Sequence, residues 1–130
     1  MLSKMCFLNC DKELPFSILN KEKGEKKKKR IVYISSKIHR RANLEKKIFT
    51  KLIFFCKKNK YNLTYLDRPG ANNYSKLVKV FNDKSWTYFS NNDQKKKYKL
   101  LNSSSLIAFA MSTLGYESLS RGLKCISFNH

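Results

Sequence analysis

The sequence has few acidic residues and no long apolar run. Of its 130 residues, 28 are Lys or Arg and 9 are Asp or Glu, so the formal net charge is +19. No apolar stretch approaches the ~18 residues that a membrane-spanning helix needs, and residues 1–20 lack the continuous apolar core of a secretory signal. We therefore expect one domain in the cytoplasm, with at most a peripheral contact to the anionic inner face of the cell membrane.

Arginine is also scarce, with 5 Arg against 23 Lys and 12 Asn. Proteins that read bases or grip phosphates specifically rely on the planar guanidinium of Arg. Lys and Asn share A/T-rich codons, so a biased genome produces such a composition without selection for a partner. We interpret the charge mainly as compositional background and expect nucleic acid to bind only non-specifically.

The sequence lacks the usual metal-binding patterns. Its cysteines form no C-x-x-C pair, and neither histidine completes a zinc-binding spacing with them. No D-x-D motif occurs either, so we predict no metal and no cofactor. Because free Cys usually packs as a small hydrophobic residue, we expect buried, reduced thiols at Cys6, Cys10, Cys56 and Cys125.

The chain divides into two parts by its pattern. Residues 1–28 show no clear periodicity and run into the Lys-rich stretch KEKGEKKKKR, so we expect an irregular basic linker. From residue 29 onward, β-branched and aromatic runs alternate with amphipathic segments. That alternation predicts an α/β fold with an open, doubly wound, Rossmann-like and mostly parallel sheet of about five strands with flanking helices. The strands are expected at 31–35, 62–66, 86–89, 106–111 and 125–128.

The stretch of residues 106–128 is the most informative for function. An apolar strand there leads into Ser112 and Thr113, followed by Gly115 and Glu117 at the start of a helix. Small residues at such a junction let a phosphate approach the free N–H groups of the helix, and a carboxylate can accept hydrogen bonds from sugar hydroxyls. A purely structural interpretation stays open: Ser112 caps the helix, Gly115 allows close packing and Glu117 suits the helix dipole.

The same stretch resembles a known signature. STLGYESLSRGLKCISF (residues 112–128) is similar to the S-T-x-G-x-E-A-L-x-x-G-K-x-V motif near the donor site of GT-B-type glycosyltransferases of capsule and O-antigen biosynthesis. Residues 29–128 as a whole resemble a group of O-antigen biosynthesis proteins. Ser118 stands where Ala is usual, and Leu123 separates Gly122 from Lys124. The uridine-diphosphate-sugar 2-epimerases carry a related S-G-G…E-A motif.

The resemblance implies that residues 29–130 form the C-terminal, nucleotide-sugar-binding half of such a transferase. It implies that a donor diphosphate lies near the residues after the fourth predicted strand and that Glu117 holds ribose or sugar hydroxyls. Residues of the first βα loop would reach across the cleft, and Arg68 would neutralise phosphate charge, although plain surface charge is the alternative for the arginines. The implied donor-binding residues are Ser112, Thr113, Gly115, Glu117, Ser36, Lys37, Arg40 and Arg68.

The resemblance also implies that this sequence does not contain the N-terminal acceptor domain of such a transferase. GT-B transferases carry the acceptor site, and usually the catalytic base, on an N-terminal domain that residues 1–28 cannot supply. We therefore expect a domain truncated at its C-terminus that binds a donor but needs a separate chain for transfer, and we name no catalytic residue. Two other functions remain open: a basic α/β module that binds nucleic acid or other polyanions, and a relative of the nucleotide-sugar epimerases.

Overall fold

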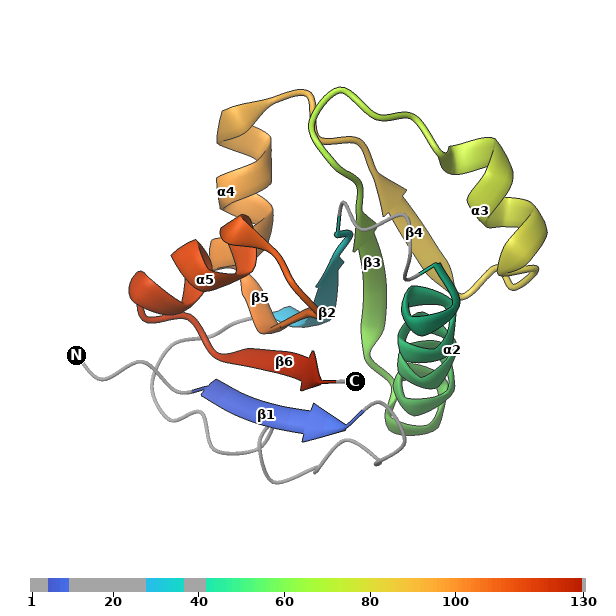
Figure 1. The fold of residues 1–130 in the computed structure, drawn as a ribbon, viewed down its shortest axis with the longest axis horizontal. Coiled ribbons are helices and arrows are strands. Elements are labelled where there is room, and N and C mark those ends of the chain that lie inside the picture. The colour runs from blue at the N-terminus through green and yellow to red at the C-terminus, as the bar shows by residue number, and fades with distance from the viewer. Residues whose placement is uncertain (1–4, 10–27, 37–41, 130) are drawn as a thin grey trace.

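The computed structural model describes residues 5–9, 28–36 and 42–129. Within them, six strands form one parallel sheet in the order β1-β6-β5-β2-β3-β4, with four helices packed around it (Figure 1). The strands are β1 (Met5–Asn9), β2 (Lys28–Ile34), β3 (Asn62–Leu66), β4 (Trp86–Phe89), β5 (Ser104–Phe109) and β6 (Cys125–Asn129), and the helices are α2 (Ala42–Asn59), α3 (Tyr74–Val80), α4 (Gln94–Asn102) and α5 (Thr113–Ser120).

The order of the strands confirms the predicted doubly wound, Rossmann-like fold. From β2 the chain moves outward through β3 to β4, then returns across the sheet through α4 to β5 and continues to β6. All strand pairs are parallel. The direction of winding therefore reverses between β2 and β5, which is the place where open α/β sheets usually bind their ligands.

The N-terminal region differs from the sequence-based expectation. Residues 1–28 were expected to be irregular, but Met5–Asn9 form the edge strand β1. This strand pairs in parallel with β6, with Met5 opposite Cys125 and Asn9 opposite Asn129. The sheet consequently has six strands where about five were expected.

Alternate residues of the central strands point to opposite faces of the sheet. Ile31 and Tyr33 of β2 pack in the hydrophobic cluster under α2, whereas Val32 and Ile34 pack in the cluster under α4 and α5. Figure 1 shows α2 on one side of the sheet and α4 with α5 on the other. Both faces of the sheet are thus covered, which explains the continuous apolar runs of its strands.

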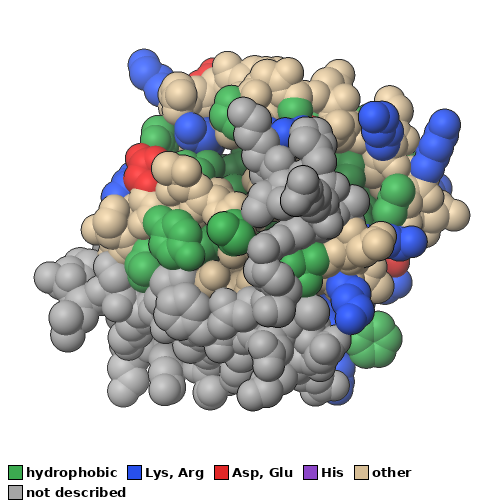
Figure 2. All heavy atoms as spheres, viewed as in Figure 1, with side chains coloured by type: hydrophobic (Ala, Val, Ile, Leu, Met, Phe, Trp, Pro, Cys, Tyr) green, Lys and Arg blue, Asp and Glu red, His purple; other side chains and the backbone are tan. Residues whose placement is uncertain are grey.

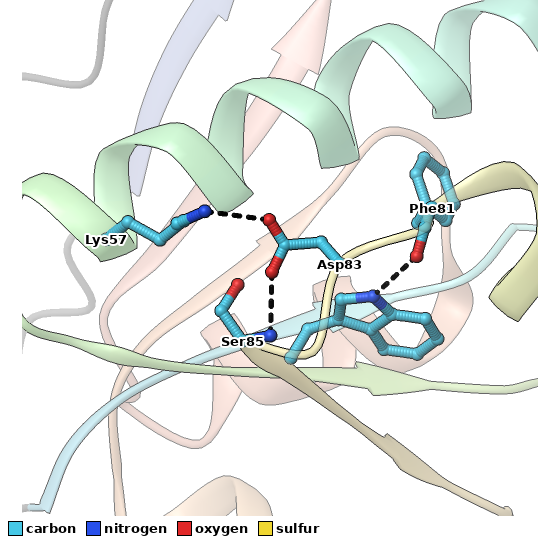
Figure 3. A network of polar contacts seen from close by, with 5 residues as sticks. Lys57, Phe81, Asp83 and Ser85 are labelled. Carbon is cyan, nitrogen blue, oxygen red and sulfur yellow. Dashed lines mark hydrogen bonds and ion pairs between the residues drawn. The ribbon is translucent and has the colours of Figure 1, made fainter.

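A polar network ties α2 to the turn before β4 (Figure 3). Lys57 Nζ lies 2.9 Å from Asp83 Oδ2, and Ser85 N–H donates to Asp83 Oδ1 at 2.7 Å. Beside it, Trp86 Nε1–H donates to the carbonyl of Phe81 at 3.1 Å. These contacts fix the turn that leads from α3 into the outer strand.

Two of the predicted buried thiols are confirmed. Cys56 and Cys125 are both buried thiols, and burial raises the pKa of the Cys56 thiol to about 12. The side chains of Cys6 and Cys10 lie outside the part of the chain that the structure describes. None of the helices in residues 42–129 is long and apolar enough to cross a membrane.

Candidate functional site

A cavity of about 790 Å³ opens at the carboxyl ends of β2, β3 and β5. It lies where the winding of the sheet reverses, which is the position at which folds of this kind usually bind ligands. Its walls come from the loops after these strands and from the first turns of α4 and α5. The lining residues are Ile34, Ser35, Ser36, Asp67, Arg68, Pro69, Gly70, Ala71, Asn91, Lys97, Met111, Ser112, Thr113, Leu114, Tyr116 and Glu117.

The N-terminus of α5 forms one wall of the cavity. Ser112 caps the helix, because its Oγ accepts from the N–H of Gly115 at 3.2 Å and its carbonyl accepts from the N–H of Tyr116 at 3.1 Å. In residues 5–9, 28–36 and 42–129, the backbone N–H groups of Thr113 and Leu114 have no acceptor. Two free donors at the positive end of a helix dipole are suited to an anionic group.

Gly115 lies behind this wall and does not line the cavity. It is buried, and a Cβ atom at this position would overlap the ring of Phe109 on β5. The absence of a side chain therefore lets α5 pack closely against the sheet. This contact supports the structural interpretation of Gly115, and it holds the neighbouring N–H groups in place at the end of β5.

Glu117 lines the cavity one turn further along α5. Its Oε1 accepts a hydrogen bond from Tyr98 OH of α4 at 2.8 Å, and this bond raises the pKa of the Tyr98 phenol. The guanidinium carbon of Arg121 lies 4.6 Å from the centre of the Tyr98 ring, a distance at which cation–π attraction operates. Tyr98 thus orients the carboxylate of Glu117, whose Oε2 has no hydrogen-bond partner among the described residues.

Asp67 organises the loop after β3. Its carboxylate accepts from Tyr88 OH at 2.6 Å and from the backbone N–H groups of Arg68 at 2.7 Å and Asn73 at 3.0 Å. Burial alone raises the pKa of Asp67, but these hydrogen bonds outweigh it and lower the pKa below its usual value. Asp67 was given no site role from the sequence, whereas in the structure it shapes the segment that carries Arg68.

The loop after β2 is fixed by a second carboxylate. Glu45 Oε1, in the first turn of α2, accepts from the Ser36 N–H and from Tyr33 OH, both at 3.2 Å. Tyr65 OH donates to Ser35 Oγ at 2.9 Å. These bonds hold residues 35 and 36 at the cavity rim, and the predicted Lys37 and Arg40 lie outside the residues that the structure describes.

Lys97 is a cavity residue that the sequence analysis missed. Only 6% of its surface is exposed, although it is a lysine in a Lys-rich helix. Its Nζ lies 4.7 Å from the centre of the Tyr98 ring. A signal was present in the sequence, because Lys97 stands three residues before Leu100 and four before Leu101, on the face of the helix that packs inward.

The structure therefore gathers most of the predicted site residues around one cavity. Ser36, Arg68, Ser112, Thr113 and Glu117 all line it, although they come from three different strand ends. In the described part of the chain, no cluster of three or more His, Cys, Asp or Glu side chains could hold a metal ion. The cavity offers N–H donors, two cationic side chains and one oriented carboxylate, which suits a ligand with both anionic groups and hydroxyls.

Comparison with known proteins gives one match. No curated protein and no solved structure matches the chain. Residues 43–130 match the model of a family described as "putative O-antigen biosynthesis protein". The match spans α2 to β6 and includes the cavity-lining parts of α4 and α5. Since it covers more than half of the chain, this protein belongs to that O-antigen biosynthesis family, which links it to polysaccharide biosynthesis.

Proposed function

We propose that this protein binds the nucleotide-sugar donor of a GT-B-type glycosyltransferase that builds surface polysaccharide. The observation that carries the proposal is the cavity of about 790 Å³ at the reversal of the sheet, because it is lined by Thr113 and Leu114, whose N–H groups have no acceptor among the described residues. A cavity of that size accommodates a small-molecule ligand. The O-antigen family supports a sugar-containing substrate.

In this proposal the donor diphosphate lies against the N-terminus of α5. The helix dipole and the two N–H groups would stabilise its negative charge, and the cation of Arg68 lines the same cavity. Glu117, held by Tyr98, would accept hydrogen bonds from ribose or sugar hydroxyls. The resemblance of residues 112–128 to the donor-site signature supports the same assignment.

The chemistry proposed for these residues is binding and leaving-group stabilisation. Positioned donors that neutralise charge on a departing diphosphate lower the barrier to sugar transfer. The acceptor and the base would come from a partner domain, which this chain would meet at the cavity. We therefore expect donor binding by this chain and sugar transfer only together with that partner.

Isothermal titration calorimetry with uridine, guanosine, cytidine and thymidine diphosphates tests the proposal. We expect at least one of them to bind with one-to-one stoichiometry, and Glu117→Gln to weaken that binding about 10-fold, because a hydrogen bond to a charged group contributes about 1.5–3 kcal/mol. Asp83→Asn is the matched control, since it removes the same charge from a surface carboxylate far from the cavity lining. Absence of binding by all four diphosphates would overturn the proposal.

Specific nucleic-acid binding is the alternative function, and it needs aromatic or Arg side chains gathered on one surface. The large aromatic rings of the described residues are mostly in the core instead, among them Tyr33, Phe49, Tyr65, Trp86 and Phe109. We expect binding to DNA and RNA to weaken steeply between 50 and 200 mM salt, as purely ionic binding does. Binding that is sequence-dependent and resists salt would favour the alternative.

A further inference from the structure

We propose that Lys97 is the cationic side chain that selects a diphosphate over a monophosphate in the cavity, an inference that rests on the proposed donor binding. Neither the family signature nor the predicted loop residues include this lysine. It comes from α4, one helix before the signature, and reaches the cavity only through the packing of α4 beside α5.

The burial of Lys97 is the first observation. Lysine is among the residues that are almost never fully buried unless they are paired, and Lys97 is only 6% exposed. Within the described residues, no carboxylate lies within ion-pair distance of its Nζ, and its contact is with the face of the Tyr98 ring. No side-chain nitrogen of the described residues is buried without a hydrogen-bond partner, so the stem of Lys97 is buried while its ammonium opens to the cavity that it lines. An ammonium that opens to a cavity and has no acidic partner there is available to an anionic ligand.

The distribution of charge in the cavity is the second observation. Its lining holds two acids, Asp67 and Glu117, and two cations, Arg68 and Lys97. Both acids already accept hydrogen bonds from protein donors. Neither cation is paired with an acid in the described part of the chain. The four formal charges cancel, but because neither cation is held in an ion pair, both are available to an anionic ligand.

The third observation is the place of Lys97 relative to α5. Tyr98, the next residue of α4, donates to Glu117 in the second turn of α5, so the first turns of the two helices line one side of the cavity. The free N–H groups of Thr113 and Leu114 can hold one phosphate. An ammonium that lines the same cavity can act as a point charge for a second phosphate, as lysines do in other phosphate sites.

The inference predicts a specific order of affinities. A nucleoside diphosphate should bind more tightly than the matching monophosphate, and inorganic pyrophosphate should bind more tightly than inorganic phosphate. Lys97→Met should weaken diphosphate and pyrophosphate binding by about 10- to 100-fold while changing monophosphate and phosphate binding much less. Lys97→Arg keeps the charge and should recover part of the lost affinity.

Calorimetry with these four ligands at one fixed ionic strength tests the inference. Lys95→Met is the matched control, because Lys95 lies on the same helix, is exposed and does not line the cavity. The melting temperature without ligand gives an independent readout: Lys97 forms no ion pair with a described carboxylate, so replacement by an apolar side chain of similar length should leave Lys97→Met about as stable as the natural protein.

The possible outcomes separate the two proposals. Diphosphate binding that Lys97→Met leaves unchanged, or that Lys95→Met weakens equally, would overturn the role of Lys97 while the donor site stands. Pyrophosphate binding that depends on Lys97, without binding of any nucleoside diphosphate, would support Lys97 and overturn the nucleotide donor. Absence of binding by every one of these ligands would overturn both.

Discussion

Single side chains hold the cavity in shape through multiple hydrogen bonds. Asp67 fixes the loop after β3, and Glu45 fixes the loop after β2. Asp67 accepts from two backbone N–H groups of its loop, and Glu45 accepts from one, that of Ser36. A buried N–H without an acceptor is costly, so these acids serve the structure first. Glu117 differs, because its protein partner is a Tyr98 hydroxyl and not the backbone.

The ion pair in Figure 3 gives a pH-dependent prediction. Hydrogen bonds from Ser85 and Lys57 lower the pKa of Asp83 from 3.8 to about 2. A lowered pKa in the folded state means that the stabilisation is complete above pH 3.8 and is lost as the pH falls through 2. We expect Asp83→Asn to lower the free energy of unfolding by under about 1 kcal/mol at pH 6, as for other surface pairs.

Urea denaturation at pH 6, 4 and 3 measures this effect. The difference between the natural protein and the Asp83→Asn variant should be constant from pH 6 to pH 4 and smaller at pH 3. A difference that grows as the pH falls would show that the carboxylate of Asp83 is not stabilised by Lys57 and Ser85.

At the scale of elements, α5 is the part of the fold that positions the site. Ser112 caps its first turn. Gly122, with φ of +86°, ends it in a left-handed turn in which Gly122 N–H donates to the carbonyl of Leu119 and Leu123 N–H to that of Ser118. The cap at Ser112 agrees with the structural interpretation offered from sequence, and both Ser and Gly have strong preferences for these two positions.

The packing of α5 on β5 gives a prediction at this scale. Gly115→Ala places a methyl group against the ring of Phe109, so we expect the free energy of unfolding to fall by about 1–3 kcal/mol, the usual cost of overpacking. Phe109→Leu should relieve part of that cost in the double variant, which a double-mutant cycle measures. Equal stability of Gly115→Ala and the natural protein would show that the two elements are less tightly packed.

The sequence predicted the bounds of single strands better than it predicted which strands pair with one another. The strands at 62–66 and 86–89 were predicted with the bounds that the structure has, because each is a compact run of β-branched and aromatic residues. The strand Met5–Asn9 was missed, since it is short and isolated in a region without periodicity and its partner β6 lies at the other end of the chain. Pairing between distant segments leaves little local signal.

The same contrast between local and long-range signals explains which residues of the candidate site were predicted. Residues 112–117 were found because they follow a recognisable strand and form a local pattern. Lys97 was not singled out because 23 lysines in one chain hide the one that points inward. Only the packing of α4 against α5 distinguishes it from its exposed neighbours.

At the scale of the whole molecule, the formal net charge is +19. On the face that Figure 2 shows, the Lys and Arg side chains of the described residues lie apart from one another and form no continuous patch. The net charge of +19 therefore predicts weak, salt-sensitive attraction to polyanions. The positive charges that bear on the proposed function are the two cations that line the cavity, Arg68 and Lys97.

The central claim is that a nucleoside diphosphate binds in the cavity at the end of β5. Two-dimensional ¹H–¹⁵N NMR, with the diphosphate titrated into the labelled protein, tests this claim most directly. The account predicts the largest shifts at the amides of Thr113, Leu114, Arg68 and Ser36, which surround the cavity. No shift, or shifts confined to the exposed lysines of α2, would contradict it.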